Sequence, residues 1–307
     1  MKDLAIIIVS FDVRNRLDEC LRSVFGSCDV SLDVCVVDNA SSDGSAALVR
    51  DRHPQALLIE SPHNGGYAYA NNLGLRRLGY GYRYLLLLNP DTRLGPDDLA
   101  RSVAFMDGHP EVGIMGPKLV REDGSLDLAA RRSFPTPAVA FYRMAGLSRL
   151  FPRSRRFGRY NLTFLDPDQT AEVDAVAGAF MLLRPLAVEQ AGLLDERFFL
   201  YGEDLDWALR IKNLRWKVVY YPGVSVLHYK RESSRRHRRR ATQEFYRSMR
   251  LFFEKHYAAT TSPPLRLAIL GAIRLRGWLA QATVWLESFR GVEHWASLSL
   301  DRSSGLR

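Results

Sequence analysis

Apolar runs alternate with amphipathic stretches over the first hundred residues of the chain. Continuous apolar runs are typical of strands covered on both faces, and they lie at residues 4–11, 30–37, 56–60 and 82–88. Between them, one-sided apolar patterns predict helices at 14–25, 41–50 and 66–78. This alternation favours an α/β fold with a mainly parallel, doubly wound sheet, in which ligands bind beyond the carboxyl ends of the strands.

The rest of the chain is less regular. Strands are expected at 112–120, 173–183 and 216–227, and a helix at 204–213. Residues 131–168, rich in Arg, Phe and Pro, predict a long loop or lid. The composition changes after His228, so we expect one domain at 1–229 and a basic helical region at 230–307.

Positive charge is concentrated in that last region. The chain has 37 Arg and 6 Lys and a net charge of +9; residues 230–307 hold 16 basic and 6 acidic residues, and residues 1–229 hold 27 and 28. A basic tail on a near-neutral body suggests an anionic partner, either a membrane surface or a nucleic acid. A solvated charged helix is the alternative for the basic run at 230–255. The apolar residues and tryptophans at 267–286 favour an interfacial helix or a dimerisation surface.

No segment resembles a membrane span or a secretion signal. Apolar runs of about 20 residues are lacking, and Arg266, Arg274 and Arg276 interrupt the nearest candidate. Three cysteines without metal spacing are expected to be reduced thiols. A cytoplasmic protein bound to the inner face of the cell membrane is therefore predicted.

Polar residues follow the predicted strands. Ser10 and Asp38 end two of them, and a carboxylate at Asp38 can accept hydrogen bonds from a nucleobase imide or a ribose hydroxyl. A turn-forming role for Asp38 is the alternative. Asn64 and Gly65, with Asn71 further on, open a helix with small and amide residues, which suits phosphate. A tight turn is the alternative there.

Asn89-Pro90-Asp91 ends the most apolar strand. A carboxylate at Asp91 suits Mg²⁺ or Mn²⁺ that also bridges a diphosphate, although an ordinary turn explains it as well. His228, at the end of the last predicted strand, is either a metal or phosphate ligand or a satisfied strand-end histidine.

The stretch DERFFLYGEDLDWALR, residues 195–210, carries the strongest candidate for acid–base chemistry. Glu203 and Asp204 begin a helix, where the dipole stabilises a carboxylate that can act as a general base. Trp207 lies one turn later and could stack on a sugar face; a core position is the alternative.

The order of these motifs resembles that in the inverting glycosyltransferases of family 2, and is closest to the bacterial rhamnosyltransferase-like branch. The motifs are, in order, Ser10-Phe11, VVDNASSDGS, NGGYAYANNLG, LLLLNPD, GAFMLLR and FFLYGEDLDWALR. The resemblance runs from Leu4 to His228. It implies a GT-A fold, with a mainly parallel nucleotide-binding sheet, a smaller mixed acceptor half and, here, a helical C-terminal tail.

The resemblance also implies roles for single residues. Asp38 would recognise the nucleobase, Asn89 and Asp91 would form the metal-binding motif, and Asp204 of the Glu203-Asp204 pair would be the catalytic base. Asn89 departs from the family pattern, which has an acid there. Donor-sugar and acceptor contacts are implied for the segment Gly178, Ala179 and Phe180.

The implied reaction is a single displacement that moves a sugar, with L-rhamnose from dTDP-rhamnose as the best candidate, onto a hydroxyl of a glycan. The acceptor would be a polyprenyl-diphosphate-linked glycan of cell-surface polysaccharide synthesis. Two other classes remain as alternatives. A sugar nucleotidyltransferase usually has a Gly-rich loop after its first strand, which is lacking here, and a basic nucleic-acid-binding or membrane-binding protein without enzymatic activity would show a basic face on its body.

Overall fold

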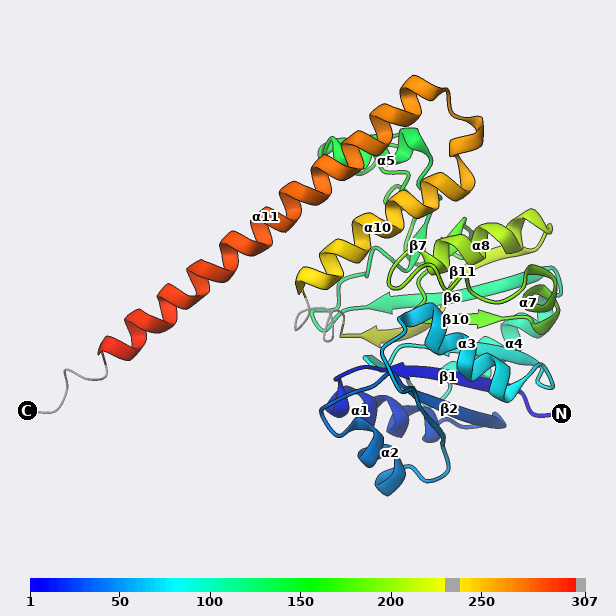
Figure 1. The fold of residues 1–307 in the computed structure, drawn as a ribbon. Coiled ribbons are helices and arrows are strands. Elements are labelled where there is room, and N and C mark those ends of the chain that lie inside the picture. The colour runs from blue at the N-terminus through cyan, green and yellow to red at the C-terminus, as the bar shows by residue number, and fades with distance from the viewer. Residues whose placement is uncertain (230–237, 302–307) are drawn as a thin grey trace, which may run out of the picture. The chain divides into compact units, whose positions relative to one another are not determined.

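A computed structural model of the chain describes residues 1–229 and 238–301, and side chains as far as Glu287. The chain divides into two compact units, Met1–Ser233 and Ser234–Arg307. The first unit contains the sheet and the second contains two long helices (Figure 1).

The first unit is built on one nine-stranded sheet in the order β3-β2-β1-β4-β10-β6-β11-β5, with β8 paired to β11. Its strands are β1 (Leu4–Ser10), β2 (Leu32–Asp38), β3 (Leu57–Glu60), β4 (Tyr84–Leu88), β5 (Thr92–Arg93), β6 (Val112–Val120), β8 (Ala171–Glu172), β10 (Phe180–Leu183) and β11 (Lys217–His228). Strands β3, β2, β1 and β4 are parallel, as are β6 and β11, whereas β10 is antiparallel to both neighbours. The expected mainly parallel α/β sheet is confirmed.

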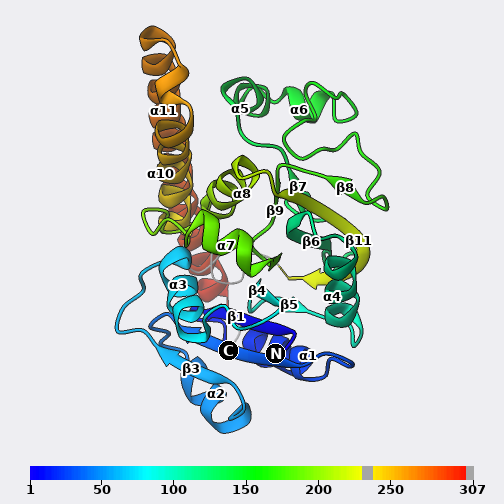
Figure 2. The same cartoon turned by 90° about the vertical axis from the view of Figure 1, so that its right-hand side faces the viewer.

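Helices cover both faces of this sheet, which is why β1 and β4 are buried along their whole length. In Figure 2, α3, α7 and α8 lie on one side of the strands and α1 and α4 on the other. The helices are α1 (Arg14–Phe25), α2 (Ser45–Arg52), α3 (Tyr67–Leu78), α4 (Asp98–Gly108), α7 (Pro185–Ala191) and α8 (Glu203–Asn213).

The prediction of a single strand at 173–183 is wrong. The chain forms β9 (Ala175–Val176), turns at Ala177–Ala179 and continues as β10. At this turn Gly178 lies close to Tyr67, where a Cβ would be 3.2 Å from the Tyr67 hydroxyl. Strand β9 pairs with β7 (Arg131–Arg132) in a separate two-stranded sheet.

The region expected to be a loop or lid contains short elements. After β7 come α5 (Pro137–Met144) and α6 (Leu147–Leu150). Thr136 caps α5 by accepting a hydrogen bond from Val139 N, and Pro137 fits the first helical turn. The rest of 131–168 is irregular.

The second unit is a helical pair, α10 (Arg238–His256) and α11 (Pro263–Asp301), joined through the 3₁₀ turn η1 (Ala258–Thr260). Gln281 donates to the carbonyl of Arg239 at 2.9 Å, and Arg238 pairs with Glu287 at 2.6 Å, so the helices run antiparallel. Within the described residues, no helix is both long enough and apolar enough to cross a bilayer. The basic residues at 235–237 lie outside the described residues.

Candidate active site

Ser10 and Asp38 lie side by side because β1 and β2 pair in parallel register, Ser10 opposite Asp38. Both are almost fully buried. One carboxylate oxygen of Asp38 accepts a hydrogen bond from Ser41 N at 3.0 Å. The other oxygen and the Ser10 hydroxyl find no hydrogen-bond partner among the residues that the structure describes. Buried polar atoms without partners are costly, so this pair is suited to a polar ligand that supplies them.

Asn39 connects the end of β2 to the loop before α3. Its amide nitrogen donates to the Asn64 side-chain oxygen at 3.0 Å and to the Gly66 carbonyl, and its own oxygen accepts from Gly65 N. Asn64 also accepts from Gly66 N at 3.0 Å. The two amide side chains therefore fix the Gly65-Gly66 backbone beside Asp38.

Gly66 brings the start of α3 against the segment that precedes α8. Its φ of +90° lies in the left-handed region, and a Cβ there would lie 2.3 Å from the Phe199 carbonyl oxygen. The next residue, Tyr67, donates its backbone N–H to that same oxygen at 2.7 Å. A close approach of two backbones therefore requires glycine at this position.

Asn71 and Asn72 are both buried in α3, and neither amide points to an open site. Asn71 donates to the Tyr67 carbonyl one turn earlier at 2.9 Å. Asn72 donates to the Leu194 carbonyl and to Glu196, and accepts from Leu194 N. Asn72 thus ties α3 to the loop after α7, whereas the amide of Asn71 bonds back to its own helix.

Asn89 and Asp91 follow β4, as expected, and pairing of β5 with β11 brings His228 to them. Thr92 lies opposite His228 in that pairing, and His228 Nε2 lies 3.4 Å from an Asp91 oxygen. The other ring nitrogen, Nδ1, lies 3.1 Å from the fully buried Asp127. Burial alone would lower the pKa of His228, but the two carboxylates outweigh it and raise the pKa to about 9.

The Asp91–His228 pair fits a divalent cation that a ligand helps to hold. Among the described residues, no three His, Cys, Asp or Glu side chains are grouped so as to enclose a metal. A cation such as Mg²⁺ is commonly bound by one or two carboxylates together with substrate phosphates. Asp91, with His228 beside it, provides that partial set.

The Gly178 peptide lies between α3 and α8. Its carbonyl accepts from the Tyr67 hydroxyl at 2.7 Å, and its N–H donates to Asp204 at 3.2 Å. The Ala179 carbonyl accepts from Asn89 N at 2.9 Å, which ties the same turn to the residues that follow β4. Phe180 is fully buried in β10, so of these three residues only Gly178 is partly exposed.

Asp204 forms a short ion pair with a buried arginine. Arg132, which is almost fully buried, donates to its carboxylate at 2.5 Å and to the Val176 carbonyl at 2.7 Å. Burial would lower the pKa of Arg132, but the charge of Asp204 raises it overall, so the guanidinium stays charged. The other Asp204 oxygen accepts from Leu205 N at 2.8 Å. Arg132 and the Gly178 N–H thus fix the orientation of the carboxylate.

Glu203 is buried beside Asp204. One of its oxygens has no hydrogen-bond partner within the described part of the chain. Burial, and next the negative charge of Asp204, raise the pKa of Glu203 to about 8. At neutral pH Glu203 therefore holds a proton while the adjacent Asp204 pairs with Arg132.

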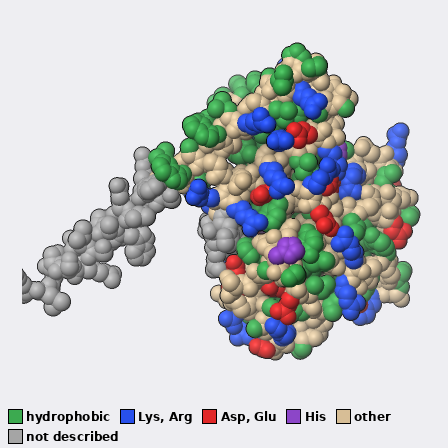
Figure 3. Space-filling model, in the orientation of Figure 1, with side chains coloured by type: hydrophobic (Ala, Val, Ile, Leu, Met, Phe, Trp, Pro, Cys, Tyr) green, Lys and Arg blue, Asp and Glu red, His purple; other side chains and the backbone are tan. Residues whose placement is uncertain are grey.

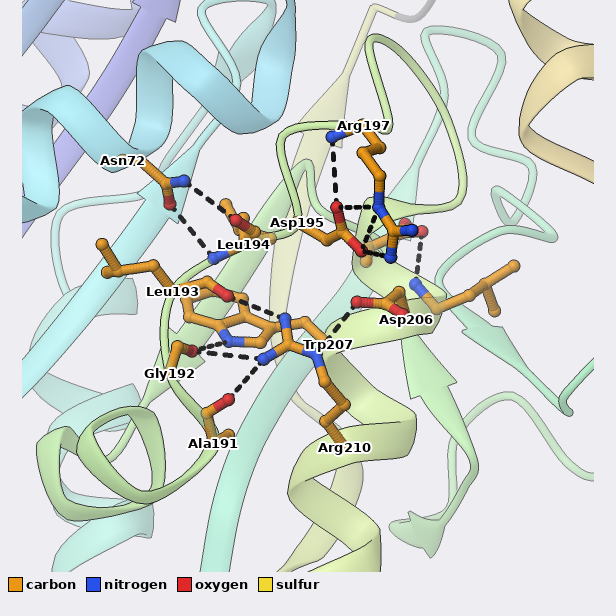
Figure 4. Close-up of polar contacts among 12 residues, drawn as sticks. Asn72, Ala191, Gly192, Leu193, Leu194, Asp195, Arg197, Asp206, Trp207 and Arg210 are labelled. Atoms are coloured by element: carbon orange, nitrogen blue, oxygen red, sulfur yellow. Dashed lines mark hydrogen bonds and ion pairs between the residues drawn. The ribbon is translucent and has the colours of Figure 1, made fainter. Parts of the chain in front are cut away.

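Figure 4 shows how the loop leading to this helix is held. Arg210 pairs with the fully buried Asp206 at 2.9 Å and donates to the carbonyls of Ala191, Gly192 and Leu193. Trp207 is fully buried, and its indole N–H donates to Gly192 at 2.8 Å. Because Trp207 has no exposed ring face, we assign it to the core rather than to a sugar-binding surface.

Sequence analysis missed several residues of this site. Arg132 and Asp127 stand in no motif and reach the site from outside the β-α alternation, whereas Asn39 and Tyr67 lie inside VVDNASSDGS and NGGYAYANNLG but had no role assigned to them. The available signal was local: Asn39 follows Asp38 directly, and Tyr67 follows the Gly65-Gly66 pair.

The family model and the relatives that this chain resembles are all described as glycosyltransferases. Residues 5–183 match the model described as glycosyl transferase family 2. An N-acetylglucosaminyl-diphospho-decaprenol L-rhamnosyltransferase of Mycobacterium tuberculosis is 28% identical over 286 residues, 90% of this chain and 92% of the relative. The rhamnosyltransferase WbbL of Escherichia coli is 26% identical over 242 residues, 75% of this chain and 84% of the relative.

Solved structures share the fold. The mannosyltransferase PcManGT from Pyrobaculum calidifontis, in complex with GDP-Man and Mn²⁺, has a TM-score of 0.57 at 20% identity, covering 100% of this chain and 79% of its own. S. aureus TarS 1–349 in complex with UDP-GlcNAc has a TM-score of 0.56 at 18% identity, covering 88% and 71%. The expected GT-A architecture is confirmed by these glycosyltransferases.

Proposed function

Because this chain belongs to glycosyl transferase family 2, we propose that it transfers L-rhamnose from a nucleoside-diphosphate donor to a hydroxyl of a lipid-linked glycan. Two relatives are named rhamnosyltransferases, and the name of one specifies a diphospho-decaprenol acceptor. Such a reaction belongs to cell-surface polysaccharide synthesis. Family membership favours transfer over the nucleotidyltransferase and nucleic-acid-binding alternatives.

The observation that carries the proposal is a pair of complementary groups, one at the ends of β1 and β2 and one at the start of α8. One side holds buried polar atoms of Ser10 and Asp38 without partners, and the other holds a carboxylate, Asp204, fixed by Arg132. The Gly178 turn and Tyr67 join the two sides. A nucleotide and a hydroxyl acceptor are the ligands that this combination suits.

On the donor side, Asp38 accepts a hydrogen bond from the nucleobase, and Ser10 provides a second polar contact. Asn64 and Gly65 hold the loop at the start of α3, where backbone N–H groups and the helix dipole favour the diphosphate. The supports of that loop are the Asn39 and Asn64 amides.

Asp91, with Asn89 at the same strand end, would hold Mg²⁺ or Mn²⁺ in this proposal, and His228 would join them as the neutral imidazole once the cation displaces its ring proton. The bound cation supplies charge neutralisation for the departing diphosphate. A neighbouring fold in complex with Mn²⁺ is consistent with this choice. Asn89 stands where the family pattern has an acid, so Asp91 is the principal protein ligand.

On the acceptor side, Asp204 removes the proton from the attacking hydroxyl. The acceptor oxygen forms a bond to the anomeric carbon, the bond from that carbon to the diphosphate breaks on the opposite face, and the nucleoside diphosphate leaves. The configuration at the anomeric carbon is therefore inverted. Buried Glu203 lies next to the base and carries a proton at neutral pH.

The second unit offers a surface for the membrane that would carry such an acceptor. Large apolar side chains of α11 are exposed, among them Leu267 at 73% and Trp278 at 68%. Figure 3 shows hydrophobic side chains gathered along the described part of this helix. We propose that this face of α11 lies in the interface of the inner membrane, on its cytoplasmic side, with a homodimer contact as the alternative occupant.

A thermal-shift panel tests the donor. The protein is melted with dTDP-rhamnose, UDP-sugars and GDP-sugars, each with and without Mg²⁺ or Mn²⁺. A ligand at about 100 times its Kd adds about 2.7 kcal/mol to the free energy of unfolding. We expect dTDP-rhamnose to stabilise most, with a metal-dependent part that is lost in Asp91→Ala but kept in Asp97→Ala.

A transfer assay completes the test. The donor selected by the panel is incubated with a short-chain prenyl-diphosphate-linked N-acetylglucosamine, and the anomeric configuration of the product is read by NMR. An inverted linkage is expected. Retention of configuration would contradict the single displacement, and stabilisation by another nucleotide sugar would contradict the rhamnose donor.

A further inference from the structure

A strongly basic segment lies inside the first unit. Residues 133–161, here called the arm, contain six arginines and no Asp, Glu or Lys. The arm includes α5 and α6, and Figures 1 and 2 both show these helices at the end of the unit opposite to β2 and α2. The near-neutral total of residues 1–229 therefore conceals a local excess of positive charge.

The arm's charge is uncompensated. All six arginines are exposed, and within the described residues none of them forms an ion pair with a carboxylate; they are Arg143, Arg149, Arg153, Arg155, Arg156 and Arg159. Two of them form hydrogen bonds to side chains, and both partners are neutral groups of the arm itself. Arg143 donates to Asn161 at 2.6 Å and Arg156 to the Tyr142 hydroxyl at 2.9 Å.

The arm also exposes large apolar side chains among these arginines. Phe141 is 62% exposed, Leu150 70% and Phe151 52%. An internal contact of Tyr142 with Phe157, edge to face at 5.1 Å, holds α5 to the loop after α6. Exposed apolar groups interleaved with unpaired arginines are typical of a surface that meets anionic lipid.

The base of the arm is attached to the candidate acceptor side. Ser133 N donates to the Tyr160 carbonyl at 2.9 Å, and Asn161 donates to the Leu128 carbonyl at 2.8 Å, so the two ends of the arm are held together. The residue before the arm is Arg132, the partner of Asp204. A ligand bound to the arm is therefore held next to β7, the strand whose Arg132 fixes the candidate base Asp204.

We propose that the arm is a contact surface for an anionic lipid bilayer, separate from the apolar face of α11. Arginine suits this role because its guanidinium binds phosphate in a bidentate manner while its stem lies along apolar surface. For its biological sense the inference rests on the proposed transfer to a lipid-linked acceptor, because the bilayer would present the acceptor's diphosphate at the base of the arm.

Vesicle sedimentation with the full chain tests the proposal, without donor or acceptor present. The probes are vesicles of phosphatidylcholine alone and of phosphatidylcholine with phosphatidylglycerol in a three-to-one ratio. The test variant replaces Arg149, Arg153 and Arg155 by Gln. The matched control replaces Arg50, Arg77 and Arg101 by Gln. These three arginines are exposed and lie outside the arm, so the control loses the same amount of positive charge.

We expect the arm variant to bind the anionic vesicles about 10- to 100-fold more weakly than the control, since each arginine near an anionic surface contributes several-fold. A second pair of variants separates the effect of apolar contact from that of charge. The first is the double variant Phe141→Ser, Leu150→Ser in the arm. The second is the double variant Leu186→Ser, Leu214→Ser, at exposed residues outside the arm. The first double variant is expected to weaken binding and the second to leave it unchanged. Melting curves check that all variants fold.

Equal binding by the arm variant and its charge-matched control would overturn the proposal, because the second unit or the net charge would then account for binding. Tighter binding to an RNA oligonucleotide than to anionic vesicles at the same ionic strength would also overturn it. Vesicle binding can fail while the transfer assay succeeds, and transfer can fail while vesicles still bind. The proposed bilayer contact and the proposed glycosyl transfer are therefore tested separately.

Discussion

Asp204 and Glu203 are adjacent carboxyl groups whose surroundings give them different charges. Arg132 and the Gly178 N–H stabilise the Asp204 carboxylate, whereas Glu203 is buried without a cation of its own. Placing two acidic groups in different environments is a general way to obtain one base and one neutral acid. The structure thus favours Asp204 as the group that accepts a proton.

Asp204→Asn is expected to lower kcat by at least about 10²–10⁴-fold, because an amide cannot accept the proton. Donor-induced stabilisation should persist, since Asp38 and Ser10 are unchanged. The measurements are steady-state transfer and the thermal shift with donor. Glu203→Gln is the comparison and should lower kcat less than tenfold, because Gln resembles the protonated acid. Near-normal turnover by Asp204→Asn would exclude it as the base.

The raised pKa of Glu203 predicts how stability depends on pH. The folded protein holds this proton up to a pKa of about 8, whereas the unfolded chain releases it near the ordinary value of 4.5. The folded state therefore binds more protons in between, and the free energy of unfolding falls as pH rises from about 4.5 to 8.

Glu203→Gln should remove this fall. Urea denaturation at pH 5 and pH 8 is expected to show the variant gaining on the wild type by more than about 1.4 kcal/mol, the value of one pKa unit. Asp97→Asn, at an exposed acid, serves as the control. Parallel curves for wild type and Glu203→Gln would show that Glu203 titrates normally.

At the scale of elements, the site depends on contacts between segments that are distant in sequence. The segment before α8 touches the start of α3 through the Phe199 carbonyl, and β7 reaches α8 through Arg132. The same segment is anchored on its other side by Arg210 and Asn72. Displacement of any one contact is expected to alter both the donor side and the base.

Gly66→Ala tests the first contact, with Gly79→Ala as a matched control. Both glycines have φ in the left-handed region, +90° and +73°, so both variants carry a backbone strain of about 1–3 kcal/mol. Only at Gly66 would the new Cβ overlap a backbone oxygen, at 2.3 Å; at Gly79 nothing lies within 4 Å. Donor Kd should rise at least about tenfold in Gly66→Ala and stay unchanged in Gly79→Ala, as measured by calorimetry. Equal Kd values would show that this contact does not shape the donor site.

The Arg132–Asp204 ion pair is suited to a double-mutant cycle. Removing one partner of a buried pair leaves an uncompensated charge and costs about 3–5 kcal/mol. Arg132→Gln and Asp204→Asn should each destabilise the protein, and the double variant should cost clearly less than their sum. Chemical denaturation of the four proteins gives the coupling energy. Additive effects would mean that the pair contributes no mutual stabilisation.

At the scale of the whole molecule, the chain combines a transferase unit with a helical unit whose apolar face is exposed. Trp278 and Trp285 report on that face, being 68% and 48% exposed. Anionic vesicles should shift tryptophan emission to the blue, because the indoles leave water for the lipid interface.

Replacing Trp278 and Trp285 by Phe should abolish most of this shift, whereas Trp216→Phe, in the first unit, should retain it. Emission spectra with and without vesicles provide the measurement. If instead the blue shift appears without vesicles as protein concentration rises, α11 is covered by a second copy of the chain, and the homodimer alternative is favoured.

The sequence by itself determined the sheet and the strand ends that carry polar residues. Buried strands must be apolar and their connecting helices amphipathic, so 4–11 and 82–88 were recognisable from pattern alone, as were Asp38 and Asp91 just beyond strands. The motif order also identified the family, because each motif is local and survives without knowledge of contacts.

The tertiary structure alone decided which side chains meet. Hydrophobic periodicity reports burial but not pairing partners, so it could not show that Arg132 reaches Asp204 or that Asp127 reaches His228 across 101 positions. It also could not separate β9 from β10, since both are apolar and only the turn at Gly178 divides them. Trp207 illustrates the same limit: its spacing fits a sugar platform or a core position equally, and only packing against Gly192 distinguishes them.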